Sequence, residues 1–347
     1  MKLIIVSTKQ HLPDYNEFVE SLNILGVEAL LVHDLEYCFL TTHPPLHTIP
    51  IPKLLKLVKR FDPDFVMTDS IYYVPHMLKL VNRRVLFHMR GDALDEAYWH
   101  RFKSPSLFAR IYNHYLYRLG RHGIKKTDLI LPNSKWLQET VRQQLPRHPT
   151  QVLYVGIDPE KWVPNHNPRL NIKHPAAVGL FKFNVYKKTL GFLEFTKVVR
   201  KMPHVNFYFA GKGHYMNLVK KNCPSNMFLL GWLSQLDAKN LMENGDIFVH
   251  PSGQDAFPRC LKEASLLEKP IIASNIGGIP EIVKNGETGY LCSVNNVNQW
   301  ITKIRFLLDN PDIARKFGEN ARKFVKEAFD WRKIAQVFLE NLKDFEQ

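Results

Sequence analysis

Residues 250–291 read HPSGQDAFPRCLKEASLLEKPIIASNIGGIPEIVKNGETGYL and contain two carboxylates eight positions apart, Asp255 and Glu263. Pro258 lies between them, and proline is a favourable first residue for an α-helix because an N–H at that position would have no partner within the helix. The pattern therefore predicts that Asp255 lies on a loop. It places Glu263 about one turn or more inside the helix that follows.

A second turn is expected further along the same stretch. The apolar segment 269–274 is typical of a strand, and Gly277 and Gly278 after it allow a tight turn. Pro280 again suits the start of a helix. The sequence thus predicts two helix N-termini at the ends of neighbouring strands, where an open α/β sheet binds its ligand and unpaired N–H groups attract an anion.

The order of these residues resembles the C-terminal signature of the retaining glycosyltransferases of family 4, which have the GT-B fold. That signature is an acidic residue, seven others, then Glu, followed by G-G-x-x-E and N-G-x-x-G. The matching positions here are Asp255, Glu263, Gly277, Gly278, Glu281, Asn285, Gly286 and Gly289. Asp255 stands where the family usually has Glu, which keeps the charge and shortens the reach. The resemblance implies two Rossmann-like parallel-sheet domains that face each other across a cleft, with a C-terminal helix that crosses back to the first domain.

Strands and helices are expected to alternate along the rest of the chain, which indicates βαβ units on parallel sheets. In the first half the expected strands are 2–7, 27–33, 64–68, 84–88, 128–134 and 151–158, and the helices are 14–25 and 54–61. In the second half the strands are 206–211, 227–231 and 246–250, and the helices are 189–199, 297–308, 311–329 and 331–345. The Pro-, Asn- and His-rich segment 159–175 is typical of a linker. We therefore expect an acceptor domain at 1–163, joined by 331–347, and a nucleotide-sugar donor domain at 164–330.

The bulk composition is that of a globular protein with two domains. The chain has 347 residues, of which 45% are hydrophobic and 23% charged, and this balance excludes a disordered chain. No apolar run is long enough to span a bilayer, and the N-terminus becomes polar too soon for a signal peptide. The four cysteines, Cys38, Cys223, Cys260 and Cys292, are widely spaced, so a reduced, cytoplasmic protein is expected.

Two lysines of the second domain are candidates for binding a diphosphate. In the family an Arg and a Lys at this spacing clamp the diphosphate of the donor, and the resemblance places Lys182 and Lys187 there. Lys188 is an alternative to Lys187, and a simpler alternative is that these are ordinary surface lysines. A lysine neutralises charge without the two-pronged hydrogen bonding of arginine. No carboxylate pair with metal-ligand spacing follows a strand, so we expect a metal-independent enzyme without a cofactor.

The resemblance also assigns the other donor contacts. Glu263 would hold the ribose hydroxyls and Asp255 the hydroxyls of the sugar. The N–H groups of residues 277–279 (Gly277, Gly278 and Ile279) would meet the phosphates. Trp232 and Leu233 would border the nucleobase, and the alternative for Trp232 is a place in the core.

In the first domain, His88 follows the fourth strand, where the family has a His that faces the donor sugar. The alternatives are a His that pairs with a neighbouring carboxylate, or a turn built by Gly91 and Asp92. Family members usually have a glycine-rich loop after the first strand, but residues 7–13 contain no glycine. Lys9 is the candidate that would replace the missing backbone donors to the phosphates.

Residues 101–126 hold seven basic side chains and no acid, in a chain whose net charge is +14. Such an excess attracts phosphate-bearing partners, and a basic helix with one apolar face favours contact with an anionic membrane surface. That contact would place the protein peripherally on the inner face of the membrane. The alternative is a helix that packs on its own sheet with a solvated basic face. No motif for nucleic-acid recognition is visible.

Together these patterns predict a retaining, hexosyltransferase-type enzyme that moves a sugar from a UDP- or GDP-sugar to an acceptor hydroxyl. The acceptor would be a glycan, a lipid-linked precursor or a polysaccharide precursor. The expected catalytic residues are His88, Asp255, Lys182 and Lys187. The family is thought to use front-face attack assisted by the leaving phosphate, so neither a protein nucleophile nor a general base is assigned. The alternatives are a GT-B glycoside phosphorylase, a sugar epimerase, or a non-catalytic protein that binds a membrane surface.

Overall fold

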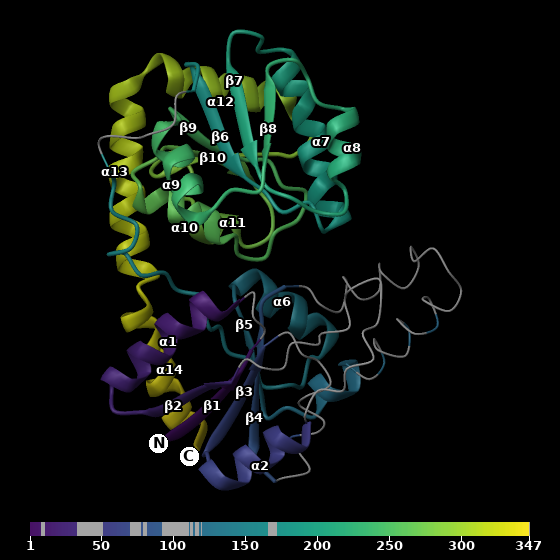
Figure 1. The fold of residues 1–347 in the computed structure, drawn as a ribbon, viewed down its shortest axis with the longest axis vertical. Helices are drawn as coiled ribbons and strands as arrows, with labels where there is room; N and C mark the ends of the chain where they lie inside the picture. Colours follow the sequence, from purple (N-terminus) through teal and green to yellow (C-terminus); the bar gives the residue numbers. More distant parts are fainter. Residues whose placement is uncertain are drawn as a thin grey trace. The chain divides into compact units, whose positions relative to one another are not determined.

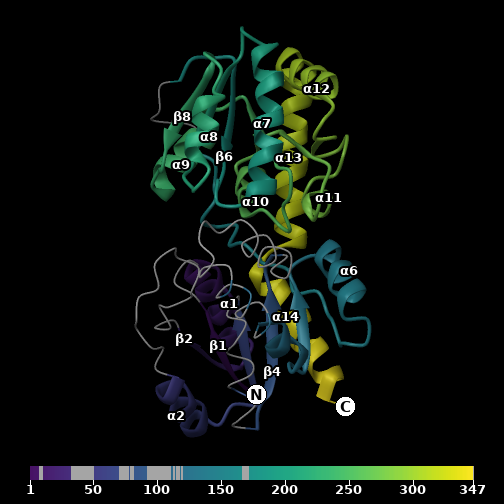
Figure 2. The same cartoon turned by 90° about the vertical axis from the view of Figure 1, so that its right-hand side faces the viewer.

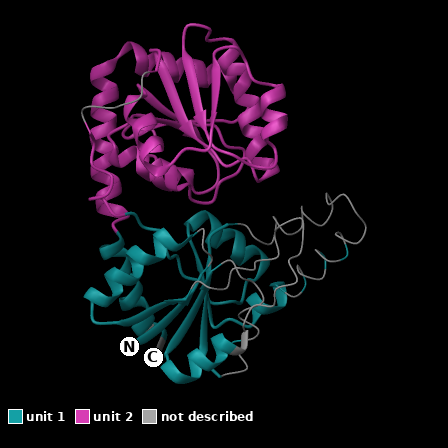
Figure 3. Ribbon diagram, in the orientation of Figure 1, with its two compact units in different colours: residues 1–157, 331–347 teal, residues 158–330 magenta. Residues whose placement is uncertain are grey.

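The computed structural model describes residues 1–7, 11–32, 51–69, 78, 82–91, 111, 114, 118, 120–165 and 172–346. The chain forms two compact units, Met1–Ile157 together with Trp331–Gln347 as unit 1, and Asp158–Asp330 as unit 2 (Figures 1 and 3). The division follows Ile157, whereas the sequence patterns place the boundary after residue 163. Each unit has its own parallel sheet, which is the Rossmann-like arrangement expected from the alternation of strands and helices.

Unit 1 is built on a five-stranded parallel sheet in the order β2-β1-β3-β4-β5. Its strands are β1 (Lys2–Val6), β2 (Glu28–Val32), β3 (Phe65–Asp69), β4 (Arg84–Met89) and β5 (Leu129–Pro132). In the centre, Ile4 of β1 pairs with Leu30 of β2 and Val66 of β3. Four of the five β1 residues are buried, which explains why the strand is an unbroken apolar run instead of an alternating one.

Helices of unit 1 include two that come from opposite ends of the chain and pack together, α1 (Leu12–Ile24) and α14 (Trp331–Glu346). The Phe18 ring lies 4.9 Å from that of Trp331 and 5.4 Å from that of Phe338, centroid to centroid. A side chain at Gly156 would overlap the Trp331 indole, so the chain before the unit boundary also closes on α14. Unit 1 further contains α2 (Ile51–Phe61) and α6 (Lys135–Gln144).

The segment 151–158 was expected to be the last strand of unit 1, and this expectation is wrong. The segment runs beside β5. The N–H of Gln151 donates to the carbonyl oxygen of Ile130, and the N–H of Leu153 donates to the carbonyl oxygen of Pro132. Pro132 has no N–H to return a bond, so the ladder cannot continue in both directions. The segment therefore follows the sheet edge as an irregular chain with an isolated bridge between Ile130 and Thr150.

Unit 2 is built on a six-stranded parallel sheet in the order β11-β10-β9-β6-β7-β8. Its strands are β6 (Ala176–Leu180), β7 (Asn206–Ala210), β8 (Met227–Gly231), β9 (Ile247–His250), β10 (Ile271–Ser274) and β11 (Gly289–Cys292). Its helices are α7 (Tyr186–Arg200), α8 (Met216–Lys221), α9 (Gln235–Asn244), α10 (Arg259–Leu266), α11 (Ile279–Ile282), α12 (Val297–Asp309) and α13 (Pro311–Ala328). Figure 2 shows α12 beside α13, and α12 contacts both α7 and α13.

An aromatic cluster fills the core between α7 and the sheet of unit 2. The ring of Phe192 lies 4.6 Å from that of Phe209, and the ring of Phe195 lies 5.0 Å from that of Trp300, centroid to centroid. All four rings are buried, and fully buried aromatic side chains contribute a large share of a domain's apolar stabilisation. This packing fixes α7, whose first turn carries Lys187 and Lys188.

Most of the expected strands and helices are confirmed, with small shifts at their ends. Pro258 is the residue before α10 instead of its first residue, and α11 is a single turn of four residues. The sequence patterns did not predict α6, α8, α9, β6 or β11. Among the described residues, no helix combines the length and the apolar composition that crossing a bilayer requires.

Candidate functional site

Asp255 lies on the loop after β9. Its carboxylate has two partners, the ammonium of Lys188 and the imidazole of His250. Oδ2 of Asp255 accepts a hydrogen bond from Nζ of Lys188 and lies 3.0 Å from Nε2 of His250. Burial raises the pKa of Asp255, but Lys188 and His250 outweigh that effect and lower it to about 2. Asp255 is therefore an ionised carboxylate on the loop that follows β9.

His250 is the neutral partner in this group. Burial lowers its pKa, against the raising effect of Asp255. Its Nε2–H donates to Asp255, and its Nδ1 faces the thiol of Cys260 at 3.6 Å. The imidazole thus fixes the orientation of Asp255 without adding a charge, and Lys188 is the residue that neutralises the carboxylate.

Lys188 is the lysine that the structure brings to the acid of the motif. Its ammonium lies 5.2 Å from the centroid of the Phe181 ring, so an aromatic face and a carboxylate both hold it. Lys187 precedes it in the first turn of α7 and is half-buried, and Lys182 is exposed just after β6. Of the two alternatives left by the spacing, Lys188 is the lysine that contacts Asp255, and contact of either lysine with the donor phosphates stays a prediction.

Glycines allow the loop of Asp255 to lie directly on α7. A Cβ at Gly191 of α7 would overlap the backbone of Gly253, and the N–H of Gly253 donates to the carbonyl oxygen of Lys188 at 3.2 Å. Neither position leaves room for a side chain. The close approach brings the start of α7 within reach of Asp255.

The turn after β10 closes on the same loop. Gly277 has a φ of +56°, in the left-handed region, and a Cβ there would overlap the carbonyl oxygen of Asp255. The N–H of Gly278 donates to that oxygen at 3.1 Å. The Ile279 side chain is fully buried, so only its backbone is available to a ligand. The structure therefore brings together Asp255, Gly277 and Gly278, as the motif implied.

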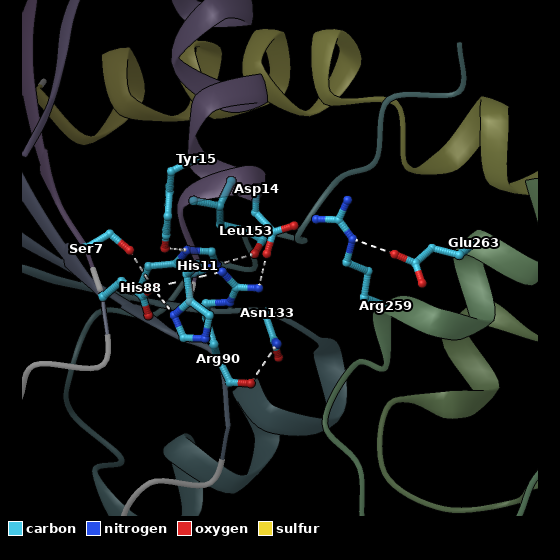
Figure 4. A network of polar contacts seen from close by, with 11 residues as sticks. Ser7, His11, Asp14, Tyr15, His88, Arg90, Asn133, Leu153, Arg259 and Glu263 are labelled. Carbon is cyan, nitrogen blue, oxygen red and sulfur yellow. Dashed lines mark hydrogen bonds and ion pairs between the residues drawn. The ribbon is translucent and has the colours of Figure 1, made fainter. Parts of the chain in front are cut away.

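Glu263 lies on α10, one helical turn after Arg259. Its Oε1 accepts a hydrogen bond from Nε of Arg259 at 2.9 Å, and 13% of the side chain is exposed (Figure 4). An arginine partner fixes the direction of a carboxylate through a charge-assisted hydrogen bond. Binding of ribose hydroxyls by Glu263 remains a prediction, and Arg259 is a supporting residue that the motif did not reveal.

Trp232 follows β8 and is 64% exposed, so the alternative that it belongs to the core is wrong. The Nζ of Lys212 lies 4.5 Å from the centroid of its ring. An exposed aromatic face beside a cation suits stacking with a planar base. Leu233, the next residue, is half-buried.

In unit 1, His88 lies at the end of β4 and is fully buried. Its Nε2 donates to the carbonyl oxygen of Leu153 at 3.0 Å, and its Nδ1 accepts from the hydroxyl of Tyr15 at 2.5 Å (Figure 4). Burial lowers the pKa of His88 to about 3, and burial raises that of Tyr15 well above its usual value. Both ring nitrogens of this neutral imidazole are thus occupied, and its role toward a donor sugar stays a prediction.

A buried aspartate, Asp69, lies at the end of β3 beside His88. Its Oδ2 accepts from the hydroxyl of Ser7 at 3.1 Å and lies 2.6 Å from Nδ1 of His11. Nη1 of Arg90 is 3.9 Å from the same oxygen, and Nη2 of Arg90 bonds to Asp14. Burial raises the pKa of Asp69, but His11 and Arg90 outweigh it and hold the pKa well below its usual range.

Most residues of this cluster match no motif in the sequence. His11, Asp14 and Asp69 belong to no spacing pattern. Asp69 is the last residue of β3, whereas His11 caps α1 and Asp14 lies in its first turn, after β1 in the chain. Asn133 joins the cluster by donating from Nδ2 to the carbonyl oxygen of Arg90 at 2.9 Å. Polar residues at the carboxyl ends of consecutive parallel strands were the signal that could have found them.

Some of the predicted site residues lie outside the residues that the structure describes. Lys9 and most of 101–126 lie outside the described residues. Within 101–126, Ile111 of the expected apolar face is 61% exposed, and Arg118, Arg121, Lys125 and Lys126 are exposed. In the part of the chain that is described, no group of three or more His, Cys, Asp or Glu side chains could hold a metal ion.

Two family models match this chain and together span both units. Residues 5–161 match Glycosyltransferase Family 4, and residues 182–324 match Glycosyl transferases group 1. An uncharacterized glycosyltransferase of Methanocaldococcus jannaschii is 35% identical over 132 residues, or 37% of each chain. The N-acetyl-alpha-D-glucosaminyl L-malate synthase of Bacillus anthracis is 26% identical over 236 residues, or 64% of this chain and 61% of that one. The matches span between 37% and 61% of the length of these relatives.

Solved structures share the fold along nearly the whole chain. Sucrose-phosphate synthase from Thermosynechococcus elongatus superposes with a TM-score of 0.76 at 16% identity, covering 99% of both chains. HepE from Anabaena, in complex with UDP-glucose, superposes with a TM-score of 0.74 at 18% identity, covering 99% of this chain and 100% of HepE. At such identities the likeness establishes the GT-B architecture of two Rossmann-like units and nothing about substrates.

Proposed function

This chain belongs to the group 1 and family 4 glycosyltransferases, and from that premise we propose that it transfers a sugar from a nucleotide-diphosphate sugar to an acceptor hydroxyl. The observation that supports this best is the ionised Asp255 between Lys188 and His250, on a loop that only glycines at 191, 253 and 277 allow. A carboxylate and an ammonium side by side match a sugar hydroxyl and the phosphate attached to that sugar.

Unit 2 is proposed to bind the donor. Lys188 leaves Asp255 for the diphosphate, with Lys182 and Lys187 as further positive groups, because charge develops on the leaving phosphate as the glycosidic bond breaks. Asp255 then accepts hydrogen bonds from the sugar hydroxyls. Glu263, held in place by its hydrogen bond from Arg259, accepts hydrogen bonds from the ribose hydroxyls.

The nucleobase is proposed to stack on Trp232. Its ring is exposed at the end of β8, and Lys212 lies over one of its faces. The structural neighbour HepE was solved with UDP-glucose, so UDP-glucose is the first donor to test, followed by GDP-sugars. We further propose that the reaction retains the anomeric configuration and needs no divalent metal ion. The proposed acceptor is a glycan or a lipid-linked precursor.

Peripheral attachment to a membrane is part of the same proposal and rests on sequence. The basic segment 101–126 contains Arg118, Arg121, Lys125 and Lys126, which are exposed in the structure. Each basic residue near an anionic surface contributes about 1 kcal/mol, so such a group can hold a protein at a bilayer. Sedimentation with vesicles of anionic and of neutral phospholipid tests this point.

Calorimetry with UDP and GDP tests the donor site directly. We expect UDP or GDP to bind the wild type, and Glu263→Ala to weaken the affinity by about 10- to 100-fold, which corresponds to the loss of charge-assisted hydrogen bonds. Glu281→Ala, at the last of the three acids of the motif, serves as the matched control. Equal affinity in Glu263→Ala and the wild type would remove Glu263 from the site.

A transfer assay tests the reaction. Nucleotide sugars are incubated with the protein and mixed glycan and lipid acceptors, with and without EDTA, and released UDP or GDP is measured. We expect nucleotide release that EDTA does not abolish. Absence of transfer and hydrolysis with every nucleotide sugar would contradict the proposed function.

A further inference from the structure

The two oxygens of the Asp255 carboxylate have different surroundings. Oδ2 accepts a hydrogen bond from Nζ of Lys188 and lies 3.0 Å from Nε2 of His250. No hydrogen bond to Oδ1 is present among the described residues, and 13% of the Asp255 side chain is exposed. The protein therefore holds the carboxylate by Oδ2, and Oδ1 is the oxygen left for a ligand.

His250 is the more firmly placed of the two partners of Oδ2. In the proposed donor complex, Lys188 leaves Asp255 for the diphosphate, so the carboxylate loses one partner on binding. His250 is the last residue of β9, and only 1% of its side chain is exposed. Its ring packs against that of Phe181, 5.5 Å away from centroid to centroid. Because a buried, packed ring on a strand stays in place, His250 is the partner that remains to hold Oδ2.

The protons of this group can each be assigned to one atom. Burial raises the pKa of Asp255, but Lys188 and His250 outweigh it and lower the pKa to about 2, so the carboxylate only accepts hydrogen bonds. Burial lowers the pKa of His250, so its neutral ring has a single proton, and that proton must be on Nε2 to meet Oδ2. Nδ1 of His250 is then an acceptor.

Cys260 supplies the donor that Nδ1 requires. It is the second residue of α10, and its Sγ lies 3.6 Å from Nδ1 of His250. Burial raises the pKa of the Cys260 thiol, so the thiol keeps its proton and donates it as an S–H hydrogen bond. Cys260 thus fixes the proton of His250 on the side that faces Asp255.

A short loop holds these three residues together within unit 2. The N–H of Ser252 donates to the carbonyl oxygen of His250 at 3.0 Å, and the Ser252 hydroxyl donates to the carbonyl oxygen of Gln254 at 2.8 Å. These bonds turn the chain after β9 so that Asp255 returns to the imidazole. The arrangement lies within residues 250–260 and needs no group from unit 1.

We propose that His250 is the positioning residue that keeps Oδ1 of Asp255 aimed at the donor sugar during transfer, and that Cys260 fixes the tautomer through which it does so. This inference rests on the proposed glycosyl transfer. His250 and Cys260 act through Asp255, and no proton moves between the three residues during the reaction. The mechanism assisted by the leaving phosphate therefore needs no change.

His250→Phe tests the positioning role, because it keeps a buried ring and removes the N–H donor. The donor substrate is UDP-glucose, or the nucleotide sugar that the transfer screen identifies. We expect turnover to fall by about 10- to 100-fold, as on loss of a hydrogen bond to a charged group. UDP affinity, measured by calorimetry, should stay at the wild-type value because UDP has no sugar to meet Asp255. His250→Gln, which keeps an N–H near the position of Nε2, should recover most of the turnover.

A double-mutant cycle with Asp255→Ala separates positioning from a merely structural role. If His250 acts through Asp255, His250→Phe should lower turnover in the wild-type background and cost nothing further in Asp255→Ala. A residue that only supports the fold would cause the same loss in both backgrounds. Equal losses in the two backgrounds would therefore overturn the proposal.

The part played by Cys260 has its own test. Cys260→Ala should lower turnover by about 2- to 5-fold, because an S–H is a weak donor, and Cys260→Ser should lose less. Cys223→Ala, at a half-buried thiol that bonds to Met227, is the matched control and should leave turnover unchanged. Nitrogen-15 NMR of the imidazole, assigned by difference from His250→Gln, should show a neutral ring with its proton on Nε2. A proton on Nδ1 would overturn the assigned tautomer.

His250→Leu is the second variant if His250→Phe fails to fold, because it also removes the donor and takes less space. A folded variant without the donor that keeps wild-type turnover would overturn the role of His250 while leaving the transferase proposal intact. A wild type that transfers no sugar from any nucleotide sugar would instead overturn the transferase proposal, and with it the positioning role.

Discussion

The carboxyl edges of the two sheets are built in different ways. In unit 2, backbone segments approach so closely that Gly191, Gly253 and Gly277 have no room for side chains, and this brings Asp255 to Lys188. In unit 1, the edge is a network of side chains around the buried Asp69 and Arg90. Close backbone contact leaves glycine as the residue that fits, whereas a side-chain network can be assembled from many residue types.

The difference explains which edge could be found in the sequence. Glycines and acids at set spacings gave the unit 2 motif, and the structure places Asp255, Gly277 and Gly278 together. The side chains that meet in unit 1 are up to 76 positions apart, as in the pair of Asp14 and Arg90.

The largest effect is expected at the cation of the unit 2 edge. Lys188→Ala should lower turnover by about 10²- to 10³-fold, because it removes the charge that is proposed to stabilise the leaving diphosphate. Lys187→Ala, one residue earlier on the same helix turn, should lower turnover clearly less. Steady-state kinetics with UDP-glucose measures both. A larger loss of turnover in Lys187→Ala would assign the diphosphate contact to Lys187, as the spacing predicts.

Asp255→Ala tests whether the carboxylate of the unit 2 edge contacts the sugar or the nucleotide. It should lower turnover more than UDP affinity, because the carboxylate is proposed to contact the sugar and not the nucleotide. Calorimetry with UDP and kinetics on the same preparation give the two values. A loss confined to UDP affinity would assign Asp255 to the nucleotide.

The next effect tests the backbone contact. Gly277→Ala should lower the free energy of unfolding by about 3 kcal/mol, because the left-handed backbone alone costs about 1–2 kcal/mol and the new Cβ also overlaps Asp255. Gly286→Ala has a φ of +82° but open space around its Cβ, so it should cost only about 1 kcal/mol. Urea denaturation measures both variants, and equal losses would refute the close approach.

A pH effect is expected from the side-chain network of unit 1. An unfolded histidine has a pKa near 6.5, and burial lowers the folded pKa of His88 to about 3. Between these values the unfolded chain binds a proton that the folded chain does not. Stability should therefore fall as the pH drops from about 6.5 towards 3, by up to about 1.4 kcal/mol per pH unit.

His88→Gln is the matched variant for that effect. A glutamine amide can accept from Tyr15 through its oxygen and donate to Leu153 through its nitrogen, but it does not titrate. Urea denaturation between pH 7 and 4.5 should show a smaller slope in the variant. His250 in unit 2 also has a lowered pKa, so it contributes a slope of the same sign, and this contribution remains in His88→Gln. Identical slopes would mean that His88 is not buried neutral.

The smallest effect is expected at Trp232. Trp232→Ala should weaken UDP binding by about 1–2 kcal/mol, as the loss of one stacked ring does, with little change in stability because the side chain is 64% exposed. Calorimetry and thermal unfolding measure the two effects. Unchanged affinity would place the nucleobase elsewhere.

The sequence by itself determined the α/β class, most of the strands, the family and the acids and glycines of the unit 2 edge. These depend on local apolar periodicity and on positions where only glycine fits. The tertiary structure decided that Lys188 and not Lys187 meets Asp255, that residues 151–158 form no regular strand, and that His11 and Asp69 form a pair. Such contacts arise only when distant strands are placed side by side, and no local pattern along the chain records which neighbours a strand will have.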